Sequence, residues 1–236
     1  MKALIIIPCY NEEKRLPEKD FADFMEQHRE ISFLFVNDGS TDNTGEILKK
    51  LSSKFTNADM LELEKNCGKA EAVRRGMLHA AKSKVQFIGF FDADLATPLS
   101  ELPGMLDCAE ESTLYISGCR IMRLGSNIKR KFLRHIAGRI FATAASILLD
   151  LPVYDTQCGA KLYTAETVNR IFSRKFVTKW FFDVEILRRM IRIYGREQVI
   201  SNAVEYPLHH WIDKNGSKIK IFVVLSDFIS LLLSKD

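Results

Sequence analysis

Val85-Gln86-Phe87-Ile88-Gly89-Phe90-Phe91-Asp92-Ala93-Asp94 is the stretch that decides how the rest of the chain is interpreted. Its apolar part, Val85–Phe91, is short and rich in aromatic residues, which predicts a buried central strand. Two carboxylates follow where this strand ends. Because buried like charges repel each other, we expect a cation beside them. Oxygen ligands suit Mg²⁺ or Mn²⁺, so Asp92 and Asp94 are candidate metal ligands; solubilisation of the strand end or helix capping is the alternative.

The chain has the size and composition of a folded α/β protein. Its 236 residues are 47% hydrophobic and 27% charged, with a net charge of +4, which suffices for a large core. The five cysteines form no C-x-x-C pair, so we expect a reduced, cytoplasmic setting. Met1 leads directly into a strand-like run, and no apolar stretch reaches the roughly 18–20 residues of a spanning helix. We therefore expect neither a signal peptide nor a transmembrane helix.

Strand-like and helical patterns alternate ahead of Asp92. We expect strands over 2–8, 31–36 and 60–63, separated by helices. This alternation predicts a Rossmann-like, mostly parallel sheet with helices on both faces. Ligands of such sheets bind at the carboxyl ends of the strands. The polar loops fall at that edge: Pro8–Glu13, Asn37–Asp42, Asn66–Lys69 and Asp92–Asp94. Neither a G-x-G-x-x-G fingerprint nor a P-loop is present.

The segment after the next expected strand, 114–119, is strongly basic. From Arg120 to Arg139 it carries seven Lys or Arg residues and no acid, with apolar residues at helical spacing. We interpret it as a basic amphipathic helix that favours an anionic membrane surface; a solvated face over an ordinary core stripe is the alternative. Nucleic acid is not expected, because the total charge is small and no base-stacking motif is present. Further on we expect a strand over 155–163, a helix from Trp180 to Tyr194 and a surface helix over 219–233.

Seven motifs, in order, carry a resemblance to a known family. They are I-I-I-P-C-Y-N-E-E, V-N-D-G-S-T-D-N-T, N-C-G-K-A-E-A-V-R-R-G, F-F-D-A-D, D-T-Q-C-G-A-K-L-Y, W-F-F-D-V-E and W-x-x-x-x-G-S-K at Trp211–Lys218. The chain resembles the inverting GT-A glycosyltransferases of the dolichyl-phosphate sugar synthase type, and most of all bacterial enzymes similar to dolichyl-phosphate beta-glucosyltransferases. It departs from them at Asn37, where an acid is usual, and at Ala70, where glycine is usual. The N-terminal membrane anchor of the eukaryotic members is not expected here.

The resemblance implies a GT-A fold in one domain, 1–236, and a set of site residues. Residues 1–120 would bind the nucleotide, and 121–236 the acceptor, through the basic amphipathic and C-terminal helices. Asp94 would hold the metal, and Asp92 would lie nearer the ribose. The implied nucleotide contacts are Pro8, Tyr10, Glu12, Asp38, Lys69, Asp92, Ala93 and Arg120. The implied acceptor contacts are Arg130, Arg134 and Gln157.

The implied reaction moves a sugar, with glucose favoured, from a UDP-sugar to a polyprenyl phosphate at the inner face of the cell membrane. A phosphate monoester has a second pKa of about 6 and so needs no base at neutral pH. Asp183 matches the family's base position. It would position groups here, or act as the base if the acceptor were a hydroxyl, so Asp94 and Asp183 are the catalytic candidates. A glycosyltransferase with a hydroxyl acceptor and a silent sugar-nucleotide-binding protein are the alternatives, and a homo-oligomer stays open.

Overall fold

A seven-stranded sheet forms the centre of the protein. The structure is a computed structural model that describes residues 2–130, 132–214 and 227, without the side chains of Leu133 and Arg134. The strand order is β3-β2-β1-β4-β7-β5-β8, and β6 pairs with β9 in a separate ribbon. The strands are β1 (Ala3–Cys9), β2 (Ile31–Asn37), β3 (Ala58–Glu62), β4 (Phe87–Phe91), β5 (Tyr115–Cys119), β6 (Asn127–Lys129), β7 (Ala160–Thr164), β8 (Ala203–Pro207) and β9 (His210–Ile212).

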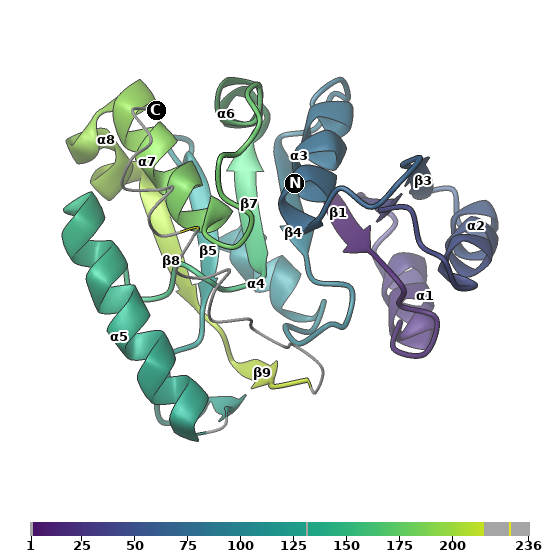
Figure 1. Cartoon of the computed structure of the whole chain (residues 1–236), viewed down its shortest axis with the longest axis horizontal. Helices are drawn as coiled ribbons and strands as arrows, with labels where there is room; N and C mark the ends of the chain where they lie inside the picture. Colours follow the sequence, from purple (N-terminus) through teal and green to yellow (C-terminus); the bar gives the residue numbers. More distant parts are fainter. Residues whose placement is uncertain (1, 131, 215–226, 228–236) are drawn as a thin grey trace.

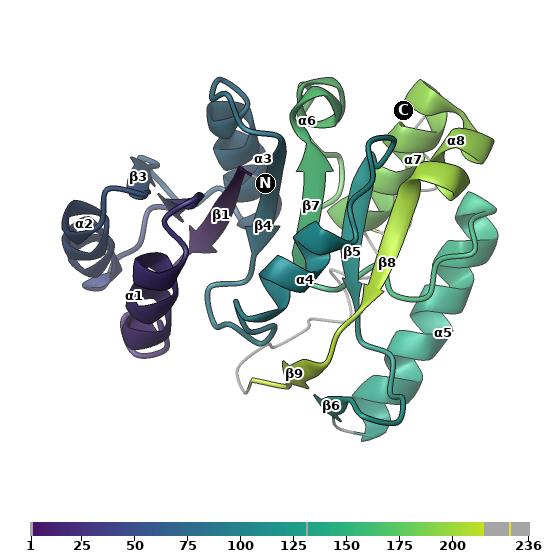
Figure 2. The ribbon, with the colours of Figure 1, turned by 180° about the vertical axis from the view of Figure 1, so that it is seen from behind.

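Helices cover both faces of the sheet, as predicted (Figures 1 and 2). They are α1 (Glu18–Gln27), α2 (Thr44–Lys54), α3 (Lys69–Ala80), α4 (Glu101–Asp107), α5 (Phe132–Leu149), α6 (Ala165–Ile171), α7 (Phe182–Tyr194) and α8 (Arg196–Asn202). One apolar core cluster joins one sheet face to α1, α2 and α4, and a second joins the opposite face to α3 and α5–α8. The expected α/β architecture is therefore confirmed.

The first four strands have the parallel pairing that the sequence predicts. β1 pairs in parallel with β2 and β4, and β2 pairs in parallel with β3. Their carboxyl ends consequently lie at one edge of the sheet. All four expected strands are present, with β3 shifted slightly toward the N-terminus relative to 60–63.

β7 interrupts the parallel order. It runs antiparallel to both neighbours, β4 and β5, and its arrowhead points opposite to that of β8 in Figure 1. The expected strand over 155–163 begins only at Ala160, so 155–159 form a loop at the edge where β4 ends. Gly89 permits the close approach of β7, because a Cβ there would lie 2.3 Å from the carbonyl oxygen of Lys161.

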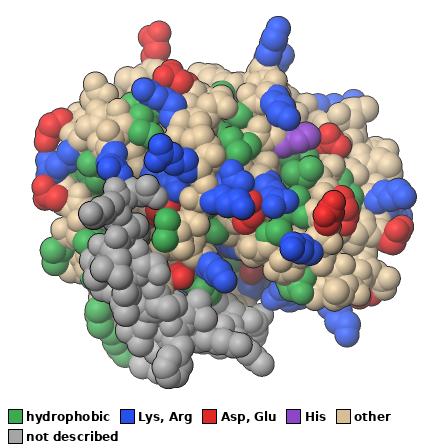
Figure 3. Space-filling model, turned by 45° about the horizontal axis from the view of Figure 1, so that its top comes forward, with side chains coloured by type: hydrophobic (Ala, Val, Ile, Leu, Met, Phe, Trp, Pro, Cys, Tyr) green, Lys and Arg blue, Asp and Glu red, His purple; other side chains and the backbone are tan. Residues whose placement is uncertain are grey.

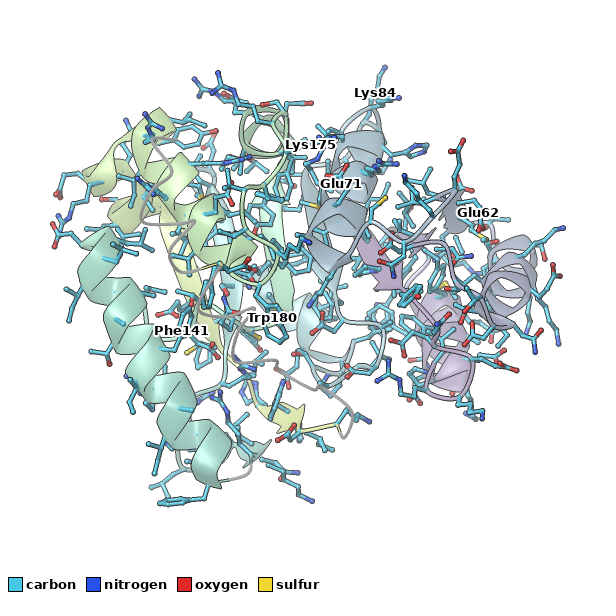
Figure 4. The ribbon with its side chains drawn as sticks, viewed as in Figure 1. Glu62, Glu71, Lys84, Phe141, Lys175 and Trp180 are labelled. Carbon is cyan, nitrogen blue, oxygen red and sulfur yellow. The ribbon has the colours of Figure 1, made fainter. Side chains whose placement is uncertain are left out.

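The prediction of one basic helix from Arg120 onward is wrong in its first part. Residues 120–130 contain β6 and turns, and α5 begins only at Phe132. Gly125 adopts a positive φ of 84°, which is incompatible with a right-handed helix. α5 is held to the protein through Phe141, which stacks on Phe181 with ring centroids 4.7 Å apart. Figure 4 shows Phe141 on α5 near the segment that carries Trp180.

The expected surface helix over 219–233 and the end of the last motif, at Gly216–Lys218, lie outside the described residues, apart from Asp227. Among the described helices, none combines the length and the apolar character needed to cross a membrane.

Candidate active site

A cavity of about 330 Å³ lies at the sheet edge where β1, β2 and β4 end. Its walls come from the loops after these strands and from the start of α3. The lining residues are Pro8, Cys9, Tyr10, Glu12, Arg15, Asp38, Asn66, Gly68, Lys69, Ala72, Asp92, Ala93 and Asp94. Except for Arg120, every residue predicted to contact the nucleotide is among them. The convergence of these loops, expected from the parallel pairing, is therefore present in the structure.

Asp38 ties two of these loops together. Its backbone N–H donates to the carbonyl of Cys9 at 2.8 Å, which joins the ends of β1 and β2. Its carboxylate accepts the N–H groups of Cys67 and Gly68, at 2.8 and 2.9 Å. Burial raises the pKa of Asp38, and these two donors oppose the rise. Because a carboxylate offers about four acceptor positions, Asp38 can order the loop before α3 and still accept a further donor from a ligand.

Glu12, Asp92 and Asp94 place three carboxylates around the cavity. Burial raises the pKa of Asp94, and the charge of Asp92 raises it further. Burial likewise raises the pKa of Glu12, although Arg15, 2.7 Å from its Oε1, opposes this. Lys69 forms an ion pair with Oδ1 of Asp92. The three acids repel one another, and the two cations, Arg15 and Lys69, balance their negative charge only in part.

This excess of carboxylate oxygen fits a divalent cation. The Oε2 atom of Glu12 is buried and has no hydrogen-bond partner among the described residues. Within the same part of the chain, no three His, Cys, Asp or Glu side chains are arranged to hold a metal by themselves. Asp92 and Asp94 would therefore hold an ion together with substrate oxygens and water, which is the usual binding mode of Mg²⁺.

Gly159, which the sequence reasoning did not single out, supports Asp92 from behind. The carbonyl of Gly159 accepts the Asp92 N–H at 3.0 Å. A Cβ at this position would lie 2.0 Å from Oδ2 of Asp92, so a side chain here would displace the carboxylate. The loop before β7 thus sets the position of the acid after β4. The only sequence signal for this was the position of Gly159 within a motif.

Lys161 is a second residue that the sequence reasoning missed. Only 1% of its side chain is exposed, and its Nζ lies 2.8 Å from Oδ1 of Asp183. The same ammonium group donates to the carbonyl of Cys158. Burial raises the pKa of Asp183, while Lys161 and Lys69 oppose this rise. Asp183 itself does not line the cavity.

Arg120 is occupied by a partner within the protein. Its Nε and Nη2 atoms donate to the two carboxylate oxygens of Asp155, at 2.6 and 2.7 Å. Its guanidinium group lies over the ring of Trp211, 5.2 Å from the centroid. Both oxygens of Glu205 accept backbone N–H groups at 2.8 Å, from Tyr154 and Asp155. This buried network therefore binds β5, β8 and the loop before β7 together.

Of the predicted acceptor residues, neither Arg130 nor Gln157 is among the residues that line the cavity. Arg130 packs against Gly138 of α5, and burial together with the charge of Arg120 lowers its pKa. The buried Nε2 of Gln157 has no hydrogen-bond partner among the described residues. The side chain of Arg134 lies outside the described part of the chain.

The sequence matches a family model over most of this structure. Residues 4–172 match the model described as glycosyl transferase family 2. Three relatives are named dolichyl-phosphate beta-glucosyltransferases. The Trichomonas vaginalis protein ALG5D is 31% identical over 242 residues, covering 96% of this chain and 71% of that protein. The Dictyostelium discoideum protein is 32% identical, covering 92% and 68%. The human protein is 30% identical, covering 92% and 69%.

Solved structures share the fold. Glucosyl-3-phosphoglycerate synthase from Mycobacterium tuberculosis, in complex with Mn²⁺, UDP and glucosyl-3-phosphoglycerate, has a TM-score of 0.71 at 16% identity, covering 98% of this chain and 78% of that one. The same enzyme with Mn²⁺ and UDP-glucose has a TM-score of 0.70. This similarity concerns the fold alone. Together with the family match, it establishes that the chain belongs to glycosyl transferase family 2 and is a glycosyltransferase with a GT-A fold.

Proposed function

We propose that this protein transfers glucose from UDP-glucose to a polyprenyl phosphate in a reaction that needs a divalent cation. The observation that carries the proposal is the set of carboxylates around the cavity, with Asp92 and Asp94 at its centre. The relatives named for glucosyl transfer to dolichyl phosphate indicate the acceptor class. The fold neighbours bound to Mn²⁺ and UDP-glucose indicate the donor.

In the proposed reaction an oxygen of the acceptor phosphate attacks the anomeric carbon, and the bond from that carbon to the UDP oxygen breaks. A bound divalent cation supplies electrostatic stabilisation of the departing diphosphate. Lys69, beside Asp92, is suited to add a second positive charge at the same place. Tyr10, which is 40% exposed at the cavity, and Asp38 would hold the base and ribose. We further propose that residues 1–120 bind the donor and 121–236 the acceptor, with Arg130, Arg134 and Gln157 near its phosphate.

The pairing of Asp183 with Lys161 favours a phosphate acceptor over a hydroxyl acceptor. A general base must reach the proton that it removes, but Asp183 contacts a buried ammonium group and does not line the cavity. A phosphate monoester is mostly deprotonated at neutral pH, so its attack requires no such base. We therefore assign Asp183 to positioning, as the counter-ion of Lys161.

The first test is to measure UDP release from UDP-glucose with a polyprenyl phosphate in detergent, with Mg²⁺ or Mn²⁺, and with EDTA. We expect release that requires both the lipid phosphate and the metal. Release without the lipid phosphate, or none with any UDP-sugar, would contradict the proposal. Other UDP-sugars in parallel test the choice of glucose.

The role of Asp183 can be tested with a pair of variants. Asp183→Asn leaves Lys161 as an unpaired buried cation, so we expect lower stability and activity. Lys161→Met/Asp183→Asn removes both charges and should recover activity relative to Asp183→Asn if Asp183 is a counter-ion. If Asp183 were the base, the double variant would stay about 10²–10⁴-fold below the wild type.

A further inference from the structure

Helix α5 is apolar on two opposite sides. Its inner side carries small and aliphatic side chains that are buried: Ala142, Ala145 and Leu149. On its outer side, Phe132, Ile140 and Ile147 are 74%, 67% and 77% exposed. The outer face of a surface helix in a soluble protein ordinarily carries polar residues. The outer face of α5 is therefore suited to an apolar environment.

These exposed side chains lie in a stripe along one side of α5, with the exposed Thr143 between Ile140 and Ile147. Phe132, Ile136, Ile140 and Ile147 follow one another at intervals of four, four and seven residues. At 3.6 residues per turn they fall within roughly a quarter of the helix circumference. Scattered exposed hydrophobic residues are normal on a protein surface, but a continuous apolar patch marks an interaction site.

The surface continues beyond the N-terminal end of α5. Leu124 is fully exposed in the turn before Gly125, and Met122 is half-exposed. In the β6–β9 ribbon, the exposed Lys129 lies opposite Ile212 in register, and Ile212 is 42% exposed. Figures 1 and 2 show this ribbon beside the first turn of α5. The exposed side chains of the turn and the ribbon therefore lie next to the N-terminal end of the stripe.

The charge of this segment has one sign. From Arg120 to Leu149 the chain contains seven Lys or Arg residues and no acid, and Arg123 and Lys129 are exposed. Figure 3 shows that Lys and Arg side chains also gather on the face over the tops of α3 and α6. Charge alone therefore does not distinguish the α5 surface. Its distinguishing property is the combination of cations with an exposed apolar stripe.

We propose that the α5 surface, comprising Met122, Leu124, Lys129, Ile212 and the outer stripe of α5, binds a membrane with anionic head groups. Apolar side chains would enter the head-group boundary while Arg123 and Lys129 contact the anionic lipids. The helix would lie along the membrane, since no described helix is suited to span one. The biological role of this membrane contact rests on the proposed function, in which the acceptor is a lipid. Arg130, a proposed acceptor residue, packs on Gly138 of α5 and so connects this surface to the proposed acceptor site.

The test is flotation of the purified protein with vesicles of phosphatidylcholine, alone or with phosphatidylglycerol. We expect binding that needs the anionic lipid and weakens as salt rises. Ile140→Glu and Ile147→Glu should each weaken binding at least tenfold. Lys129→Gln should weaken it about fivefold, the effect of one cation near an anionic surface. The matched control is Ser53→Glu, on the exposed side of α2 at the other end of the sheet (Figure 1), which should leave binding unchanged.

Two results would overturn the proposal. One is wild-type binding that is absent, or that Ile147→Glu and Ser53→Glu reduce equally. The other is a wild-type dimer that Ile147→Glu dissociates without any change in vesicle binding, since the stripe would then be covered by a second copy of the chain.

Failure of this inference can be told apart from failure of the proposed function, because flotation requires no turnover. In addition, Ile140→Glu/Ile147→Glu should keep near wild-type UDP release with a short-chain acceptor in detergent and lose it with the acceptor in vesicles. A loss with both acceptors would contradict the membrane role. If the wild type releases no UDP with either acceptor, the function fails while the flotation result still stands.

Discussion

Buried carboxylates are only partly balanced by cations at one end of the strand order of the central sheet and are fully paired at the other end. At the end formed by β1, β2 and β4, Glu12, Asp92 and Asp94 crowd one cavity, and Lys69 and Arg15 balance them only in part. At the end formed by β7, β5 and β8, buried acids have dedicated partners: Arg120 for Asp155, Lys161 for Asp183, and backbone N–H groups for Glu205.

This difference separates function from stability. Paired buried charges hold a structure together, and breaking such a pair is costly. Unbalanced carboxylates cost stability unless a ligand compensates them. We therefore expect substitutions at the first end to reduce activity more than stability, and substitutions at the second end to do the reverse.

The largest effect is expected at Asp94. Asp94→Asn removes a proposed metal ligand and should lower kcat/KM for UDP release roughly 10³-fold, a typical loss for one electrostatic contact to a developing charge. The melting temperature should stay the same or rise, because Asp94 repels Asp92. Asp107→Asn, on the exposed side of α4, is the control. A large loss of stability in Asp94→Asn would break the comparison.

Arg120 gives the converse test. Arg120→Met leaves Asp155 buried without its bidentate partner and should lower the free energy of unfolding by about 3 kcal/mol. Urea denaturation measures this loss. Arg120→Met/Asp155→Leu removes both charges, and we expect it to recover part of the stability. If the loss of stability in the double variant equals the sum of the losses in Arg120→Met and Asp155→Leu, the two side chains are not coupled.

Gly159→Ala tests the contact between Gly159, in the loop before β7, and Asp92, which follows β4. The added Cβ would overlap the Asp92 carboxylate, which is the far end of a side chain and can move. We expect about a 30-fold loss of kcat/KM with little change in melting temperature, since one displaced charge costs less than a deleted one. Unchanged activity would mean that the position of Asp92 does not depend on the loop before β7.

The smallest effect is expected at Glu71, a paired acid at the nucleotide end (Figure 4). Hydrogen bonds from Arg74 above all lower the pKa of Glu71 to about 2. Because the folded-state pKa lies below the unfolded one, the stabilisation is complete above pH about 4.5 and disappears as the pH falls toward 2. Glu71→Gln should therefore cost about 1 kcal/mol at pH 7 and progressively less below pH 4. Urea denaturation over this range checks it, and a cost that does not change with pH would contradict it.

The sequence predicted the nucleotide end better than the other end, for a physical reason. Parallel strands that follow one another through helices obey local rules, so β1 to β4 and the polar residues after them could be placed by pattern. β7 and β8 do not continue this order: β7 runs antiparallel between β4 and β5, and β8 pairs with β5. No local pattern shows that Ala160–Thr164 lies between β4 and β5, so Gly159 and Lys161 could not be placed beside Asp92 and Asp183.

The basic segment was misjudged for a related reason. Its composition was interpreted correctly as apolar and cationic, but a helix from Arg120 would require Gly125 to be helical and β9 to lack a partner. Composition indicates which surface a segment favours, whereas turns and distant pairing decide where its helix begins.

The antiparallel β7 also has a consequence for the order of folding. Phe91 pairs with Ala160, and β5 must wait for β8, which lies more than eighty residues further along the chain. β1, β2 and β4 all precede Asp92 in the chain, so they can pair before β7 and β8 have been synthesised. During synthesis the nucleotide end should therefore form first. The strand that supports Asp92 joins later, so the site becomes complete only after the second half of the chain has been made.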